Sequence, residues 1–340
     1  MKLNITNKLK KINFIISVLI IIPLNLYSYI LPLTNEKYLQ ELIHLIKKSK
    51  QQILIAHQYF YNDIGTQKLI DTLIKTKLKN KKLEIKILLE NELPQNRNIL
   101  DIFNLYYIET KLDSDKKYSH LKLVIIDGKY VIIGSTNFSK ESLTENNETN
   151  VLIKDEKTAK FFIEYFYHLW YDTKFNINQN FSLTDNIIPV VNNMYYNILK
   201  QFLITVKSKI YIIMYEIKCN PEYQDNKVNK LINLLIDCFN KNIDVKILLE
   251  KSNYNDDITK INQTTFEYLK NKGISVKFDR EDIITHSKLV LLNDDTVILG
   301  SFNWTYSSFF LNNETGIVIR DKSIYNYFLK YFYKLWFQKQ

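Results

Sequence analysis

The stretch that decides the fold is HLKLVIID at residues 120–127, because HSKLVLLN repeats it at residues 286–293. The repeat continues downstream at a constant separation of 166 residues, through Gly-Ser-x-Asn and Asn-Glu to a Leu-Trp pair. Histidine, lysine, asparagine and glutamate are not typical core residues, so packing alone does not explain why all four recur in register. Two such sets facing each other would surround one phosphate with two imidazoles and two ammonium groups.

The repeat also extends upstream, where EIKILLE (84–90) resembles DVKILLE (244–250). This self-similarity indicates a tandem duplication with two structural units. Each unit alternates helical and extended patterns, which predicts an α/β fold. For the first unit we expect helices at 39–46, 66–79, 97–105 and 161–170, and strands at 52–57, 84–89, 121–126, 130–134 and 149–153. The second unit repeats this order and is expected to open with Val191, Met194, Tyr195, Ile198 and Phe202 on one helix face.

The motif strands are expected to place their basic residues together. Side chains alternate along a strand, so His120 and Lys122 share one face, as do His286 and Lys288. Each pair can therefore reach one phosphate. The run LVII (123–126) is apolar at every position, which is typical of a strand that lies between two layers of helices.

Composition indicates a folded protein with anionic partners. The 340 residues are enough for two domains, and 46% hydrophobic with 24% charged residues is typical of globular chains. Only 6 glycines occur, so Gly134 and Gly300, at equivalent places in the two copies, mark positions where a larger side chain is not expected to fit. The net charge of +10 favours nucleic acid or an acidic membrane surface, although a generally basic surface would give the same value.

Residues 1–33 are predicted to be a signal peptide or an N-terminal membrane anchor. Lysines precede an apolar run at residues 14–24, and no acidic residue occurs before residue 29. The apolar character continues to Leu33, which makes the segment just long enough to cross a bilayer. Cleavage, with Ser28 as the best candidate position, is favoured over retention as an anchor. In both cases we expect an exported or membrane-anchored protein.

The rest of the chain is predicted to contain a first half at 34–174, a polar linker at 175–188 and a second half at 189–340. Both cysteines, Cys219 and Cys238, fall in the second half. Export would permit a disulfide between them. However, one lies in a predicted loop and the other on a predicted helix, which favours two free or buried thiols. Neither cysteine has neighbours that indicate a metal site.

The duplicated His-x-Lys-x4-Asp pattern with its Gly-Ser-x-Asn extension resembles the signature of the phospholipase D superfamily. The resemblance covers residues 36–340, and one position departs from it: Asn293 stands where the first copy has Asp127. The resemblance implies two α/β/α sandwich halves with mixed sheets, related by a pseudo-twofold axis, and one active site at their interface. It implies neither a metal nor another cofactor. Because both motifs lie in one chain, we expect a monomer.

A phosphodiesterase needs a nucleophile, an acid for the leaving alkoxide, and positive charge around the non-bridging oxygens. Neutral imidazole can attack phosphorus to give a phosphohistidine, and a second, protonated imidazole can protonate the leaving group. By family resemblance His120 is expected to be the nucleophile and His286 the general acid. The expected supporting residues stabilise charge (Lys122, Lys288, Asn137 and Asn303), orient the histidines (Glu148 and Glu314), provide hydrogen bonds (Ser135 and Ser301) or shape the strand ends (Asp127 and Asn293).

The remaining histidines are expected to play lesser roles. His44 and His168 lie on predicted helices, where surface or packing roles are expected. His57 ends the first strand and Glu216 has a similar place in the second half. Strand ends of open α/β sheets face ligands, so both side chains could line the cleft.

Three functions compete for this chain. The first is hydrolysis of membrane phospholipid headgroups, including transfer to an alcohol, which the N-terminal segment and the two-motif chain favour. The second is a metal-independent endonuclease acting on single-stranded nucleic acid, which the small halves, short loops and basic charge favour. The third is a non-catalytic module that binds an anionic polymer or a membrane. Phospholipid is the preferred substrate for the reasons given with the first function, and a membrane surface is the expected partner. The non-catalytic module is least favoured because both sets of catalytic residue types are present.

Overall fold

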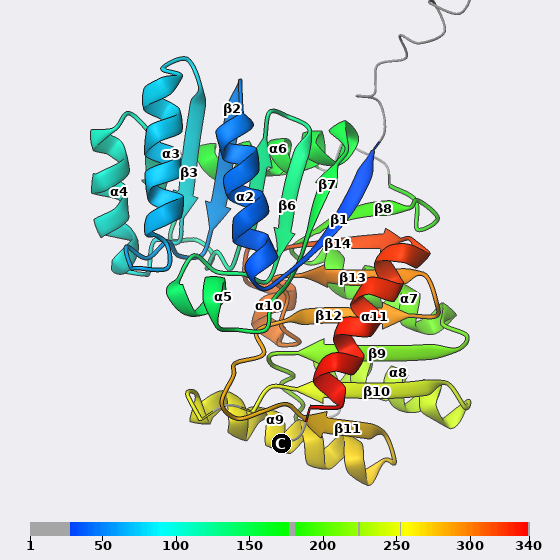
Figure 1. Cartoon of the computed structure of the whole chain (residues 1–340). Helices are drawn as coiled ribbons and strands as arrows, with labels where there is room; N and C mark the ends of the chain where they lie inside the picture. Colours follow the sequence, from blue (N-terminus) through cyan, green and yellow to red (C-terminus); the bar gives the residue numbers. More distant parts are fainter. Residues whose placement is uncertain (1–27, 177–180, 224, 252, 339–340) are drawn as a thin grey trace, which may run out of the picture.

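The computed structural model describes residues 28–176, 181–223, 225–251 and 253–338 (Figure 1). Within these residues the chain forms two halves, each built on a seven-stranded sheet. The first half consists, in chain order, of β1 (Tyr29–Thr34), α2 (Glu36–Lys48), β2 (Gln52–His57), α3 (Gln67–Lys79), β3 (Glu84–Leu89), α4 (Gln95–Leu105), β4 (Glu109–Leu112), β5 (Lys122–Ile126), β6 (Tyr130–Gly134), α5 (Lys140–Thr144), β7 (Thr149–Lys154) and α6 (Glu156–Tyr171).

The second half repeats this series element for element, and its helix between the third and fourth strands is longer, with 16 residues in place of 11. Its elements are β8 (Ile187–Val191), α7 (Met194–Thr205), β9 (Lys209–Met214), α8 (Lys227–Asn240), β10 (Asp244–Leu249), α9 (Asp256–Asn271), β11 (Ser275–Phe278), β12 (Lys288–Leu292), β13 (Thr296–Gly300), α10 (Tyr306–Phe310), β14 (Thr315–Arg320) and α11 (Lys322–Trp336).

The two sheets have the same topology. The strand order is β1-β7-β6-β5-β2-β3-β4 in the first sheet and β8-β14-β13-β12-β9-β10-β11 in the second. In both, the last three strands of this order run parallel and the other neighbours are antiparallel, so the sheets are mixed. The duplication in the sequence is therefore a duplication of the fold, and the predicted α/β class is confirmed.

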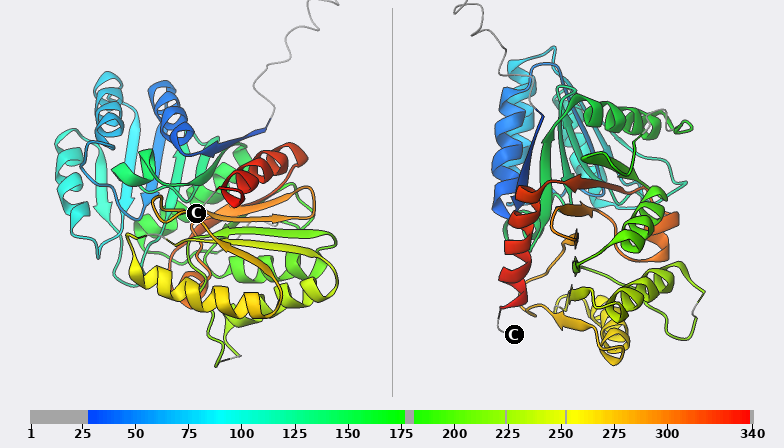
Figure 2. Two further views of the ribbon diagram at one scale, coloured as in Figure 1. Left: turned by 60° about the horizontal axis from the view of Figure 1, so that its bottom comes forward. Right: turned by 90° about the vertical axis from the view of Figure 1, so that its right-hand side faces the viewer.

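Three apolar clusters hold these layers together. The outer face of the first sheet packs against α2, α3 and α4, and that of the second sheet packs against α7, α8 and α9. The third cluster spans both halves, where the inner faces of the sheets pack with the aromatic helices α6 and α11 (Figure 2). Each sheet is thus covered by helices on both faces, and strand β5 is buried at every position.

Strand β1 corrects the predicted N-terminal boundary. The sequence placed residues 1–33 in one targeting segment, whereas β1 pairs antiparallel with β7 as the edge strand of the first sheet. Its apolar residues belong to this strand, and Pro32 is accommodated because an edge strand has one unpaired side. Residues 1–27 lie outside the described residues, so the signal peptide or anchor expected there stays a prediction. No helix in the described part of the chain is both long and apolar enough to span a bilayer.

The start of the second half differs in a similar way. Val191, expected on the first helix, is the last residue of β8, and α7 begins at Met194. The linker predicted at 175–188 therefore ends earlier, because β8 begins at Ile187. Cys219 and Cys238 are both buried and free, as expected.

The two motif glycines stand where neighbouring strands approach closely. A Cβ atom on Gly134 would collide with the backbone of Thr149, and one on Gly300 would collide with that of Thr315. This close approach brings the segment after β6 against the start of β7, and the segment after β13 against the start of β14. These segments carry the polar residues of the two motifs.

Candidate active site

Both motif histidines lie at the interface between the halves. Backbone hydrogen bonds cross this interface: the N–H of His120 donates to the carbonyl of Asn313 (2.9 Å), and the N–H of Asn147 donates to the carbonyl of Ile284 (2.8 Å). His120 is 9% exposed and His286 is 8% exposed. Both rings are therefore nearly enclosed, and the backbone of the opposite half fixes the segment that carries each of them.

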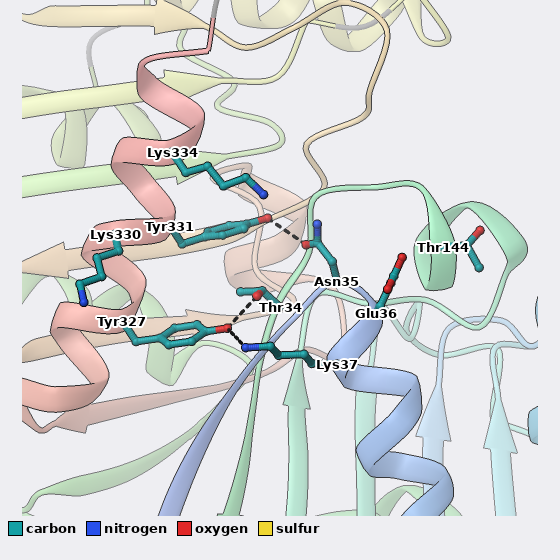
Figure 3. Close-up of a pocket in the computed structure, with 9 residues that line it drawn as sticks. All are labelled: Thr34, Asn35, Glu36, Lys37, Thr144, Tyr327, Lys330, Tyr331 and Lys334. Atoms are coloured by element: carbon teal, nitrogen blue, oxygen red, sulfur yellow. Dashed lines mark hydrogen bonds between the residues drawn. The ribbon is translucent and has the colours of Figure 1, made fainter.

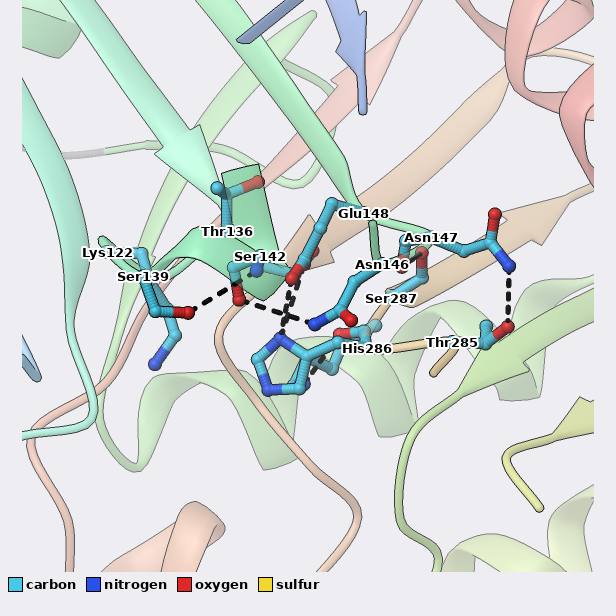
Figure 4. A network of polar contacts seen from close by, with 12 residues as sticks. Lys122, Thr136, Ser139, Ser142, Asn146, Asn147, Glu148, Thr285, His286 and Ser287 are labelled. Carbon is cyan, nitrogen blue, oxygen red and sulfur yellow. Dashed lines mark hydrogen bonds and ion pairs between the residues drawn. The ribbon is translucent and has the colours of Figure 1, made fainter. Parts of the chain in front are cut away.

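Each histidine is held by the glutamate of the other half. Nδ1 of His120 lies 3.0 Å from Oε2 of Glu314, and Nδ1 of His286 lies 3.1 and 3.2 Å from the two carboxylate oxygens of Glu148 (Figure 4). A carboxylate on Nδ1 favours the tautomer that carries its proton there and leaves Nε2 as the nitrogen available to a ligand. The sequence predicted that the glutamates orient the histidines, but it did not predict this exchange between halves.

The two glutamates are fully buried, and hydroxyl groups solvate their charge. Ser135 donates to the carboxylate of Glu148, and Ser301 donates to that of Glu314. Glu314 also accepts a hydrogen bond from the hydroxyl of Ser308 (2.5 Å). A buried carboxylate without such partners would be strongly destabilising, so the motif serines lower the cost of burying these two side chains.

A pair of asparagines outside the motifs holds the backbone of these glutamates. Oδ1 of Asn35 accepts both the backbone N–H of the first-half glutamate (3.1 Å) and the hydroxyl of Tyr331 on α11 (3.1 Å). Oδ1 of Asn192 accepts the N–H of the second-half glutamate (3.0 Å) and the hydroxyl of Tyr165 on α6 (2.7 Å). Both asparagines have positive φ, of 52° and 49°, a conformation that asparagine tolerates better than most residues. Sequence reasoning missed this arrangement, although the tyrosines recur at equivalent positions.

The two lysines are almost completely buried, and the halves hold them differently. Nζ of Lys122 donates to Oε1 of Gln58 (2.9 Å) and to the carbonyl of the preceding motif histidine (3.2 Å). Nζ of Lys288 donates to the carbonyl of its own motif histidine (2.7 Å) and lies 4.6 Å from the ring centroid of Tyr215. The same tyrosine ring stands edge-on to the second-half imidazole, with centroids 4.8 Å apart.

Burial controls the protonation of these basic groups. Burial lowers the pKa of His120, with partial compensation by Glu314, and burial together with Lys288 lowers the pKa of His286 to about 4. Burial also lowers the pKa of Lys288 to about 7 and that of Lys122 well below its usual range. A bound phosphodiester anion would oppose these shifts, because a nearby negative charge favours the protonated form of each group.

Glu148, the acidic partner of His286, keeps its charge although it is buried. Burial alone would raise the pKa of Glu148, but His286, Lys288 and Ser135 outweigh it and hold this pKa below its usual value. The glutamate therefore remains ionised at neutral pH and keeps its orienting charge.

The motif asparagines also lie in the enclosed region. Asn137 follows β6 and is buried, and Asn303 follows β13 and is half-buried. The side-chain oxygens of both are buried without a hydrogen-bond partner among the described residues. Buried amide groups normally form hydrogen bonds, so these oxygens retain the capacity to accept one from a bound ligand.

Asp127 and Asn293 organise the ends of the motif strands and stand away from the histidines. Both adopt positive φ, at 51° and 54°. The carboxylate of Asp127 accepts three consecutive backbone N–H groups, from residues 50–52, at 2.8–3.1 Å. Oδ1 of Asn293 accepts the N–H groups of residues 207 and 208 at 2.8 and 3.3 Å. One oxygen is enough for this task, which explains why an amide replaces the acid in the second half.

Two more buried glutamates support the site, and sequence reasoning did not single them out. The carboxylate of Glu90, directly after β3, accepts the N–H of Ser119, the residue before the first motif histidine. Oε2 of Glu250, directly after β10, accepts the N–H of Thr285 (2.5 Å), the residue before the second. The signal was present in the duplicated EIKILLE and DVKILLE segments, which both end on these residues.

Asp113 lies next to Glu90, and its ionisation is expected to weaken the fold. Burial and the neighbouring carboxylate raise the pKa of Asp113 to about 7. A raised folded-state pKa gives stability that is present at about pH 4 and is lost as the pH rises through 7. Asp113→Asn should remove this loss, about 2–4 kcal/mol of unfolding free energy at pH 8. Urea unfolding at pH 5 and pH 8 measures it, with exposed Asp115→Asn as control. An equal pH dependence in all three proteins would contradict the expectation.

The other candidate residues take packing or peripheral places. His57 is buried and stacks on Phe138 with ring centroids 3.9 Å apart, while His44 is exposed and His168 is half-buried. Glu216 is half-buried, and burial raises its pKa against the opposing charge of the nearby lysines. No group of three or more His, Cys, Asp or Glu side chains in the described ranges is placed to hold a metal ion.

Comparison with known sequences gives one family match in each half of the chain. A family model described as "Cardiolipin synthase, PLD-like domain" matches residues 42–170 and again residues 199–336. The phospholipase D of Rickettsia bellii (strain RML369-C) is 33% identical over 96 residues, which are 28% of this chain and 45% of that protein. The mitochondrial cardiolipin hydrolase of Canis lupus familiaris is 33% identical over 63 residues, 18% of this chain and 25% of that protein. The matched region thus spans less than half the length of these curated relatives.

Among solved structures, the phosphatidylserine synthase of Haemophilus influenzae Rd KW20 is similar to this chain. The superposition has a TM-score of 0.71 at 15% sequence identity and covers 87% of this chain and 83% of that one. At this identity the similarity concerns the fold, and it extends across both halves.

Proposed function

Since this chain belongs to the phospholipase D superfamily, in the family of cardiolipin synthase and phospholipase D-like domains, we propose that it is a phosphodiesterase that acts through a covalent phosphohistidine. The observation that carries this proposal is the exchange of carboxylates at the interface. Two imidazoles, each with a buried glutamate of the opposite half on Nδ1, stand beside two buried lysines. This arrangement supplies a nucleophile, an acid and positive charge for one phosphorus.

In the first step, Nε2 of His120 attacks phosphorus and forms the P–N bond. The P–O bond to the leaving alkoxide breaks, and Nε2–H of His286 gives its proton to that oxygen. Lys122 and Lys288 stabilise the charge on the equatorial oxygens, and Asn137 and Asn303 donate further hydrogen bonds. The phosphoenzyme then carries a neutral second imidazole.

In the second step, the neutral imidazole of His286 takes a proton from water, and the resulting hydroxide attacks phosphorus. The P–N bond breaks, which restores His120 as a neutral base and leaves His286 protonated for the next cycle. An alcohol in place of water would give a new phosphodiester by the same bond changes. Hydrolysis and transfer therefore differ only in which hydroxyl compound reaches the intermediate.

We propose membrane phospholipid as the substrate. The relatives named phospholipase D and cardiolipin hydrolase support this choice, as does the signal peptide or anchor predicted at the N-terminus. Single-stranded nucleic acid is the second candidate. The net charge of +10 favours it, and so does the stacked pair Tyr59 and Tyr61 after β2, with ring centroids 4.6 Å apart, because bases stack on such rings.

The substrate is tested with purified protein, phosphatidylcholine vesicles, cardiolipin vesicles and single-stranded DNA, each with and without chelator. Headgroup release without DNA cleavage is expected, with phosphatidylethanol as an additional product when ethanol is present. DNA cleavage without lipid turnover would replace the lipid proposal by the nuclease alternative. Inactivity on all three substrates would favour a binding module.

The pH dependence of the reaction is a further prediction. The kcat/KM profile reports the free enzyme, where burial depresses the pKa of both histidines. The acid must be protonated while the nucleophile is neutral, so kcat/KM should be bell-shaped with an acidic optimum. It should fall further above pH 7, where Lys288, with its pKa of about 7, loses its charge.

The kcat profile should lie at higher pH, because the bound phosphodiester raises the pKa values in the complex. Steady-state rates on a soluble phosphodiester between pH 4 and pH 9 measure both profiles. A rate that rises monotonically through neutrality would contradict the paired-histidine mechanism.

A further inference from the structure

A pocket of about 530 Å³ lies between α2 and α11, outside the enclosed histidine site (Figure 3). Helix α11 contributes one wall, and the start of α2 contributes the opposite one, with α5 near the rim. The lining residues are Thr34, Asn35, Glu36, Lys37, Thr144, Tyr327, Lys330, Tyr331 and Lys334. We refer to this site as the α2–α11 pocket.

The α2–α11 pocket is strongly basic. Its three lysines, Lys37, Lys330 and Lys334, are exposed, and Glu36 is the single acid among the lining residues. In the described part of the chain, none of the three ammonium groups forms an ion pair with a carboxylate. Nζ of Lys37 donates instead to the hydroxyl of Tyr327 (3.3 Å). The pocket therefore concentrates positive charge that the protein itself leaves uncompensated.

The duplication shows that this charge is not a by-product of the fold. The tyrosine and asparagine that hold the glutamate backbone occur on both sides of the molecule, whereas the three lysines of the α2–α11 pocket have no lysine at the aligned positions of the other side. The equivalent positions in the other half are an acid, a histidine and two apolar residues: Glu164 for Lys330, His168 for Lys334, Met194 for Lys37 and Phe161 for Tyr327. The pocket beside Asn192 does contain three other lysines, Lys116, Lys117 and Lys174, but Asp113 and Asp172 line it as well. Lys116 forms an ion pair with Asp172 at 2.5 Å, so the positive charge there is partly compensated within the protein.

We propose that the α2–α11 pocket is a second anion site that binds a phosphate group, separate from the phosphorus attacked by the histidines. Lysine ammonium groups are common phosphate ligands, and several of them around one pocket can contact different oxygens of the same anion. The volume admits a phosphate together with an ester substituent, which can rest on the rings of Tyr327 and Tyr331. The group could belong to a soluble phosphate or to a phospholipid headgroup.

The pocket stands one residue away from the catalytic carboxylate. Asn35 lines the pocket, and its Oδ1 accepts both the hydroxyl of Tyr331 and the backbone N–H of Glu148. An anion here would lie behind the glutamate and would not compete for the histidines. The proposal concerns binding, so it does not depend on the catalytic function proposed above.

The experiment measures the rate at which each lysine of the full chain is acetylated by a limiting acylating reagent, read by mass spectrometry. Inorganic phosphate at about twice its dissociation constant should slow the reaction at Lys330 and Lys334 about threefold, compared with chloride of equal ionic strength. Lys322, exposed at the start of the same helix, is the internal reference and should not change. Phosphatidylglycerol vesicles form the second arm.

Protection in the phosphate arm identifies a soluble ligand, and protection only on vesicles identifies the headgroup as its source. The double variant Lys330→Gln/Lys334→Gln should lose the protection of Lys37, whereas Lys322→Gln should retain it. No protection in either arm, or equal slowing at Lys322, would overturn the proposal. A lack of phosphodiesterase activity would leave this result unchanged, so the two proposals fail separately.

Discussion

His120→Asn and His286→Asn are each expected to reduce phosphodiesterase activity by about four orders of magnitude or more, because each removes one member of the proposed pair of nucleophile and general acid. Asparagine retains some polarity in these nearly enclosed positions, so the fold should persist. Initial rates on the preferred substrate measure the loss. His44→Asn is the matched control, because His44 is exposed on α2 and should leave the rate unchanged.

The same variants determine which histidine is the nucleophile. With a substrate labelled in its phosphoryl group, His286→Asn should still accumulate label, because its nucleophile is intact and only protonation of the leaving group is impaired. A substrate with a good leaving group makes this step visible. His120→Asn should remain unlabelled. Label on His286 in the His120→Asn protein would reverse the assignment, and label in neither protein would contradict a covalent intermediate.

Glu148→Gln and Glu314→Gln are expected to lower kcat by about two to four orders of magnitude, the range that follows loss of a carboxylate that orients a catalytic imidazole. The pKa values of the two histidines test which glutamate acts on which imidazole. Because Glu148 raises the pKa of His286, Glu148→Gln should lower that pKa further and leave the pKa of His120 unchanged. Glu314→Gln should lower the pKa of His120 alone.

Nuclear magnetic resonance titration of the imidazole protons measures these shifts, and the chain has only 5 histidines to assign. Glu141→Gln, at an exposed position in α5, is the control and should change neither pKa nor kcat. A shift in the histidine of the same half as the altered glutamate would contradict the exchange of carboxylates between halves.

Much of the fold was predictable because the pattern was present twice. Buried apolar runs and helical stripes gave the helices and strands from residue 52 to residue 154 within a few residues, apart from the short elements β4 and α5. The edge strands β1 and β8 were missed. Each contains a proline. Strand β1 continues the apolar N-terminal segment, so its sequence also fits a membrane segment, and β8 continues the polar stretch that fits a linker.

The candidate site was predictable as a set of residues but not as a set of contacts. The spacing of His120, Lys122 and Glu148 is visible in the chain, whereas the pairing of Glu148 with His286 depends on how the two sheets face each other. The roles of Asn35 and Glu90 were missed for the same reason. Their bonds to the backbone of Glu148 and Ser119 join segments far apart in the sequence, and no motif spacing reports such bonds.

Because each glutamate contacts the histidine of the other half, the two copies of the repeat cannot evolve independently at this site. In most duplicated genes one copy can accumulate changes while the other preserves the ancestral activity. Here a change at Glu314 removes the carboxylate partner of His120 in the opposite copy, so neither half contains a complete histidine–glutamate pair of its own. Selection on this contact therefore acts on both halves at once.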